Sequence, residues 1–243
     1  LARGRRPHAR HLHERTDRRR KESLAQVVPL APLVEHRARL GRRDAELHQG
    51  AIESLAILHH VEREAQVGGS IHTKGFHILA GLLRRLIPID HTLAIRAAIA
   101  FEQSYGGIDG DSASGAETVC LLSALTGLPA RQDLAMTGAI DQLGHVQPIG
   151  AATQKIEGFF DVCRAVGLTG TQGVIVPRTN VGDLMLRRDV VDACAEGRFR
   201  VFAVDRIHDA LELFLGRPAG SLDAQGRYPE GSVLALAMER ATA

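Results

Sequence analysis

Short apolar runs alternate with longer amphipathic stretches after about residue 60. Apolar runs bounded by glycine, proline or polar residues predict β-strands, whereas apolar positions three or four apart predict helices. The predicted strands are 61–67, 93–101, 133–140, 173–177 and 199–204. The predicted helices are 76–86, 114–127, 152–166, 182–196 and 206–215. This alternation predicts a mixed α/β (α+β) fold in which helices pack on a mixed β-sheet.

The predicted helix 152–166 has a lysine on its apolar side. At about 100° per residue, Lys155 lies in the same arc as Phe159 and Cys163, away from the charged arc that contains Asp161. Burial disfavours the ammonium form, so the pKa of Lys155 should fall, and a fall of roughly 3 units would make it neutral near pH 7. The alternative is a lysine at the helix start that extends its amine to water.

Lysine is scarce in this chain. Of 30 basic residues only Lys21, Lys74 and Lys155 are lysines, and the rest are arginines. An arginine cannot lose its proton in a protein, whereas a desolvated lysine can. Lys155 is therefore a candidate general base.

The sequence Gly-Asp-Ser-Ala-Ser at 110–114 directly precedes the predicted helix 114–127. Ser114 and Glu117 match a capping box, which predicts Ser114 as the N-cap. Ser112 then lies just before the helix, where free N–H groups and the positive end of the helix dipole would stabilise an oxyanion. With Lys155 to accept its proton, Ser112 would be a nucleophile, which predicts a serine–lysine peptidase.

A turn rich in glycine and serine before a helix could instead cradle a phosphate, as in a small-molecule kinase. Asp109 and Asp111 flank this turn, and two carboxylates would repel a nucleotide. The peptidase interpretation is therefore favoured, and nucleotide binding is the test of the alternative.

Several longer motifs follow one another in a recognisable order. They span residues 68–75, 101–107, 110–114, 136–138, 148–161, 167–170 and 172–177. With these motifs, residues from about 58 to 216 resemble the proteolytic domain of the Lon proteases, in particular the Lon-related branch with a GDSAS serine motif. The resemblance implies a Lon-type proteolytic fold and a serine endopeptidase.

The resemblance also implies roles for individual residues. Ser112 would be the nucleophile and Lys155 the general base, with Thr137 helping to position the amine and Asp109 and Asp111 as further supporting residues.

The family has a second glycine where this chain has Ala151. If that backbone needs a positive φ, the Cβ costs about 1 kcal/mol and could displace Lys155. A catalytically impaired copy, acting only in assembly or binding, is therefore an alternative.

Partners and cofactors follow from the same resemblance. Unfolded or damaged proteins would be the substrates, and the chain would assemble into a homo-oligomeric ring, a hexamer in the family. An AAA+ ATPase module, in cis or in trans, would bind ATP and Mg²⁺. This chain contains no P-loop motif, so no cofactor is expected within it.

The composition of the chain bears on its partners and its cellular compartment. A formal net charge of +2 does not favour nucleic acid as the main partner. No apolar run approaches the ~20 residues of a membrane span, and the basic start lacks the apolar segment of a secretory signal. Three cysteines, at 120, 163 and 194, suit a reducing compartment, so we expect a cytoplasmic protein. Twelve histidines match no metal motif, so no metal site is expected.

The ends of the chain differ from its middle. Residues 1–50 contain 12 of the 27 arginines and no aromatic residue. We expect residues 1–55 to be a disordered basic extension, or sequence foreign to the fold from a fragment or a shifted reading frame. Residues 56–217 would form the Lon-like domain. Residues 218–243, rich in glycine and proline, would be an exposed tail with a short final helix.

Overall fold

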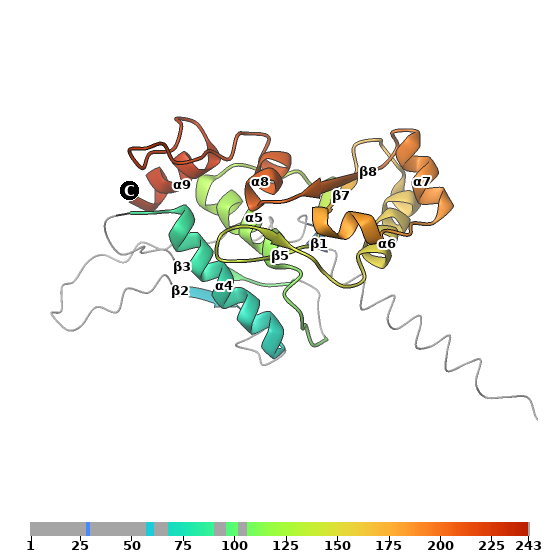
Figure 1. The fold of residues 1–243 in the computed structure, drawn as a ribbon, viewed down its shortest axis with the longest axis horizontal. Coiled ribbons are helices and arrows are strands. Elements are labelled where there is room, and N and C mark those ends of the chain that lie inside the picture. Colours follow the sequence, from blue (N-terminus) through green and yellow to red (C-terminus); the bar gives the residue numbers. More distant parts are fainter. Residues whose placement is uncertain (1–27, 30–56, 61–67, 90–95, 102–105, 243) are drawn as a thin grey trace, which may run out of the picture.

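The computed structural model describes residues 28–29, 57–60, 68–89, 96–101 and 106–242 (Figure 1). Its helices are α4 (Ser70–Leu86), α5 (Ser114–Thr126), α6 (Ala152–Val166), the 3-10 helix η1 (Arg178–Asp183), α7 (Arg188–Ala195), α8 (Ile207–Leu215) and α9 (Val233–Thr242). Its strands are β1 (Val28–Pro29), β2 (Ile57–His60), β3 (Arg96–Ile99), β4 (Leu134–Met136), β5 (Ala139–Ile140), β6 (Val146–Gln147), β7 (Gly173–Pro177) and β8 (Arg200–Val204). The predicted strand 61–67 and most of the basic segment 1–55 lie outside the described residues.

The main sheet has four strands in the order β1-β4-β7-β8. β4, β7 and β8 run parallel, and β1 pairs antiparallel with β4, so the sheet is mixed, as predicted. β2 and β3 form a separate parallel pair, and β5 and β6 form an antiparallel hairpin.

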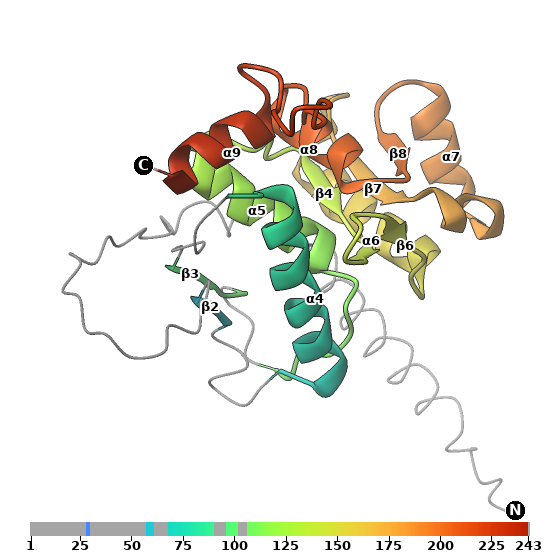
Figure 2. The same cartoon turned by 60° about the vertical axis from the view of Figure 1, so that its left-hand side comes forward.

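Helices cover both faces of the sheet. One apolar cluster joins α4, α5, α8 and α9 to one face, and a second joins α6 and α7 to the other (Figure 1, Figure 2). Side chains alternate between the faces: Leu134, Met136 and Ile175 belong to the first cluster. Ala135 and Val174 belong to the second. This period of two is what a strand buried on both sides requires. The mixed α/β prediction is confirmed.

Several predicted elements have different bounds in the structure. The predictions for α6 and β7 are correct to the residue, and that for α8 is correct to one. The predicted strand 133–140 is two strands, because the chain turns at Thr137 and Gly138 to bond with other segments. The predicted helix 182–196 covers only the end of η1 and the shorter α7, with a break between them. Helix α4 starts six residues before the predicted residue 76.

The prediction that residues 218–243 form an exposed tail is wrong for the final helix. Val233, Leu234 and Ala237 of α9 are fully buried and belong to the cluster that includes α5. The short length and the neighbouring glycines suggested a tail, but the apolar side of α9 covers the core next to α5. None of the helices within the described ranges is long and apolar enough to cross a membrane.

Candidate active site

The predicted nucleophile and base meet at the carboxyl end of β4. α5 packs on one face of the sheet and α6 on the other, and Thr137 directly follows β4 between them. Lys155 Nζ donates a hydrogen bond to Ser112 Oγ at 2.9 Å and one to Thr137 Oγ1 at 3.2 Å. The structure thus brings Ser112, Lys155 and Thr137 together, although Ser112 and Lys155 are 43 residues apart.

The amine of Lys155 is buried, as the helical pattern predicted. The residue is 2% exposed and Thr137 is fully buried. Burial lowers the pKa of Lys155 from 10.5 to about 8, although the negative charge of Asp111 acts in the opposite direction and raises it. A substantial fraction of Lys155 is therefore neutral at mildly alkaline pH.

Ala151 adopts the left-handed backbone conformation that the family's glycine would permit. Its φ is 58° and its ψ 33°, and no other non-glycine residue of the described ranges has a positive φ. Its carbonyl accepts the first hydrogen bond of α6, from the Lys155 N–H at 3.0 Å. The expected cost of the Cβ is therefore present. Displacement of Lys155 is not seen, because its amine still reaches Ser112.

A buried asparagine that the sequence analysis missed holds the chain just before Ala151. Asn180 Oδ1 accepts the N–H of Ile149 at 2.9 Å, and its Nδ2 donates to the carbonyl of Ile149 at 3.0 Å. One side chain thus satisfies both backbone groups of a residue outside regular secondary structure. No sequence spacing indicated it, because Asn180 lies in η1, which was not predicted.

Asp109 stabilises the start of α4. Its Oδ1 accepts backbone N–H groups of Ile71 and His72, 37 or more residues away, and of Gly110. The hydrogen bond from Gly110, followed by that from His72, lowers the pKa of Asp109. Asp109 therefore joins α4 to residues 109–113, here called the serine turn.

Ser114 is not the N-cap of α5, so that prediction is wrong. The N-cap is Ala113, which makes no side-chain capping bond, and Ser114 is the first helical residue. Ser114 Oγ donates to the carbonyl of Asp111 at 2.8 Å and accepts the N–H of Ile140 at 3.1 Å. It ties the serine turn to β5, a long-range contact that a local sequence pattern cannot show.

A glycine of α4 allows this helix to lie against the serine turn. A Cβ on Gly75 would lie 2.9 Å from Asp111 Cβ and 3.3 Å from Asp111 Cα. Such contacts are closer than packed carbon atoms tolerate, so only glycine fits here without displacing the turn.

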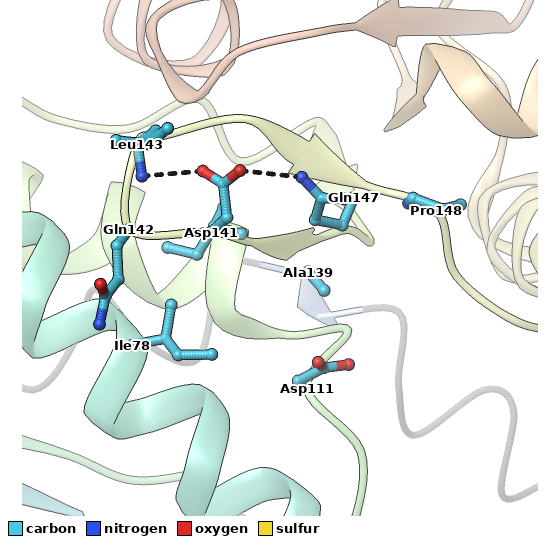
Figure 3. A pocket seen from close by; sticks show the side chains of 9 residues that line it. Ile78, Asp111, Ala139, Asp141, Gln142, Leu143, Gln147 and Pro148 are labelled. Atoms are coloured by element: carbon cyan, nitrogen blue, oxygen red, sulfur yellow. Dashed lines mark hydrogen bonds between the residues drawn. The ribbon is translucent and has the colours of Figure 1, made fainter.

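A cavity of about 510 Å³ opens beside the serine turn (Figure 3). It lies between α4, the serine turn and the β5–β6 hairpin. The described residues that line it are Ile78, Asp111, Ala139, Ile140, Asp141, Gln142, Leu143, Gln147 and Pro148. Asp111, the residue before Ser112 in the chain, lines the cavity, whereas Ser112 itself does not.

The histidine, cysteine and acidic side chains of the described residues form no candidate metal site. Among the residues that the structure describes, no three His, Cys, Asp or Glu side chains are placed to hold a metal ion. His145 Nδ1 contacts Asp141 Oδ2 at 2.9 Å, and Cys163 of α6 is buried in the core.

Residues 101–217 match the family model of the Lon protease (S16) C-terminal proteolytic domain. The chain is 46% identical over 155 residues to a putative Lon protease homolog of Escherichia coli K12. The aligned residues make up 64% of this chain and 26% of the relative. It is 45% identical over 170 residues to a putative Lon protease homolog of Haemophilus influenzae, covering 70% of this chain and 28% of the relative.

An archaeal Lon protease of Archaeoglobus fulgidus is 39% identical over 114 residues, which cover 47% of this chain and 16% of the relative. The chain thus spans about a quarter of the length of the two bacterial relatives. The matched residues include the serine turn, Thr137 and α6.

Proposed function

Because this chain contains a proteolytic domain of the Lon protease family, we propose that it hydrolyses peptide bonds as a serine endopeptidase with Ser112 as nucleophile and Lys155 as general base. The observation that carries the proposal is the buried 2.9 Å contact between Lys155 Nζ and Ser112 Oγ. A serine hydroxyl needs an adjacent base, and a lysine qualifies only when its pKa is lowered, as burial does here.

In the proposed mechanism, neutral Lys155 accepts the proton of Ser112 as Oγ attacks the carbonyl carbon of the substrate. The resulting ammonium returns a proton to the leaving amine, which departs from the acyl-enzyme. A water molecule then attacks the ester and gives a proton to Lys155, which passes it to Ser112 Oγ as the carboxylic acid product leaves. Thr137 Oγ1 accepts one N–H of the amine at 3.2 Å, which helps to direct the nitrogen lone pair to Ser112.

The start of α5 supports stabilisation of the tetrahedral intermediate. The N–H groups of Ser112 and Ala113 donate to no acceptor among the described residues. They lie at the positive end of the helix dipole, so we propose that they receive the oxyanion.

Substrates and partners are proposed from the family. We propose unfolded or damaged proteins as substrates, a homo-oligomeric ring as the assembly, and an AAA+ ATPase module, in cis or in trans, as the partner that binds ATP. A cytoplasmic location would suit such substrates. No residue of this chain is proposed to hold ATP or Mg²⁺, since the sequence has no P-loop.

A serine-directed probe tests the proposal without any need for an ATPase. The 243-residue chain would be treated with a fluorophosphonate and the labelled peptide identified by mass spectrometry, alongside cleavage of a short unstructured peptide. We expect labelling at Ser112 together with cleavage. Absence of both would favour the catalytically impaired copy, and labelling at another serine would refute the assignment.

A further inference from the structure

The cavity beside the serine turn combines apolar walls with acidic groups. Ile78, Ile140 and Pro148 contribute apolar surface, and Asp111 and Asp141 contribute carboxylates. Of the residues that the structure describes, no arginine, lysine or histidine lines it. A cavity of this size and mixed character is typical of a site that takes one side chain or a small ligand.

The two carboxylates of this cavity have different environments. Asp141 Oδ1 accepts the N–H groups of Leu143 and His145, and its Oδ2 accepts Gln147 Nε2. These bonds hold the turn between β5 and β6, and Figure 3 shows the Asp141 carboxylate bonded to Leu143 and Gln147. Asp141 is therefore a structural residue of the hairpin.

Asp111 has no such partner. Its carboxylate makes no hydrogen bond or ion pair with any residue in the described part of the chain. Figure 3 shows it on the opposite side of the cavity from the Asp141 carboxylate. An unpaired carboxylate on the wall of a partly apolar cavity favours a cationic group in that cavity.

The surrounding charges do not cancel this preference. Lys155 interacts electrostatically with Asp111, but it makes no ion pair with it, is 2% exposed and does not line the cavity. Lys74 is exposed on α4, one turn before Ile78, and forms no ion pair with Asp111. Asp109, also in the serine turn, adds a further negative charge nearby.

We propose that this cavity is a substrate subsite for a lysine or arginine side chain next to the scissile bond, an inference that rests on the proposed peptidase function. The methylene stem would lie along Ile78 and Ile140, and the cationic end would pair with Asp111. Long basic side chains suit such a site because their stems are apolar and their ends charged. Acidic side chains at the same position are rejected.

Binding to an inactive protein tests the subsite separately from catalysis. Two unstructured peptides would differ only in lysine or norleucine at one position, and their dissociation constants would be measured on the Ser112→Ala chain. The lysine peptide should bind roughly tenfold more tightly, as expected for one charge-assisted contact in a partly exposed site. Asp111→Asn in the same background should abolish this preference, whereas Asp111→Glu should retain part of it. Asp192→Asn, on the surface of α7, is the matched charge control and should leave the preference intact.

Cleavage by the active chain gives the second measurement. The ratio of kcat/KM for the two peptides should show the same preference, and the ratio cancels any effect of Asp111 on the titration of Lys155. Equal binding of the two peptides, no measurable binding of either, or a preference that survives Asp111→Asn would overturn the subsite. A binding preference without cleavage by the unmutated chain would instead refute the peptidase function and leave the cavity only as a binding site for a basic side chain.

Discussion

At the scale of residues, the chemistry depends on one buried amine. Lys155 was identifiable from the sequence because its helix has a clear apolar side and because lysine is rare in this chain. Only the direction of its pKa shift could be predicted, because burial on α6 and the charge of Asp111 set the pKa together. The role of Ser114 could not be predicted, because its partner Ile140 lies 26 residues away.

The two serines of the serine turn should respond differently to alanine. Ser112→Ala removes the proposed nucleophile and should abolish peptide cleavage with little change in stability. Ser114→Ala leaves the buried N–H of Ile140 without its acceptor and should lower the free energy of unfolding by about 1–3 kcal/mol while activity persists. Urea unfolding and peptide cleavage of both variants provide the check. An active Ser112→Ala protein would exclude Ser112 as nucleophile.

Glycine at position 151 should stabilise the protein. Ala151 holds φ at 58°, where a Cβ costs about 1 kcal/mol, so Ala151→Gly should raise the free energy of unfolding by up to that amount. Because the amine of Lys155 already reaches Ser112, peptide cleavage should change less than twofold. A large gain in activity would show instead that Ala151 impairs the site.

At the scale of elements, the sequence predicted best where each element is defined by its own residues. α6 and β7 have continuous periodic patterns, and their bounds were correct. The start of α4 was missed because its first N–H groups are satisfied by Asp109, 37 or more residues away. The break in 133–140 was missed because Gly138 donates its N–H to the carbonyl of Ser112.

Two glycines of α4 should have opposite effects when replaced by alanine. Gly75→Ala places a Cβ 2.9 Å from Asp111 Cβ, so it should displace the serine turn, lower stability by about 1–3 kcal/mol and reduce cleavage strongly. Gly81→Ala, the matched control on the same helix, meets only the flexible end of Gln142 at 3.4 Å. It should raise stability by about 0.5–1 kcal/mol with normal cleavage. Equal activity of the two variants would argue against close packing of α4 on the site.

Replacing Asn180, which binds the backbone just before α6, should lower activity more than the loss of stability alone explains. Asn180→Ala leaves both backbone groups of Ile149 unpaired, and should cost about 1–3 kcal/mol and displace the start of α6. Gln172→Ala is the control, because Gln172 similarly bonds the backbone of Thr169 and Gly167 beyond the other end of α6. Both variants should lose stability in unfolding experiments, but kcat should fall markedly only for Asn180→Ala. A similar kcat for both would remove Asn180 from the positioning of Lys155.

At the scale of the whole molecule, the candidate site lies where the two layers of helices meet across the sheet. Ser112 belongs to the layer of α5 and Lys155 to the layer of α6, and Thr137 leaves the sheet between them. Patterning along the chain predicts that both layers exist but not which residues of one face the other. For this reason the motifs identified the dyad residues, whereas the cavity and the Asn180 contact became visible only in three dimensions.

The titration of peptide cleavage tests the central claim most directly. The unmutated chain, Lys155→Arg and Lys155→Ala would be compared on one short unstructured peptide from pH 6 to 10. If neutral Lys155 is the base, the kcat/KM of the unmutated chain should rise with pH and level off above a midpoint near the lowered pKa of about 8. Both variants should be inactive throughout, since the guanidinium stays protonated and alanine has no base. A Lys155→Arg protein with a substantial rate, or an unmutated chain whose rate does not titrate in this range, would contradict the dyad.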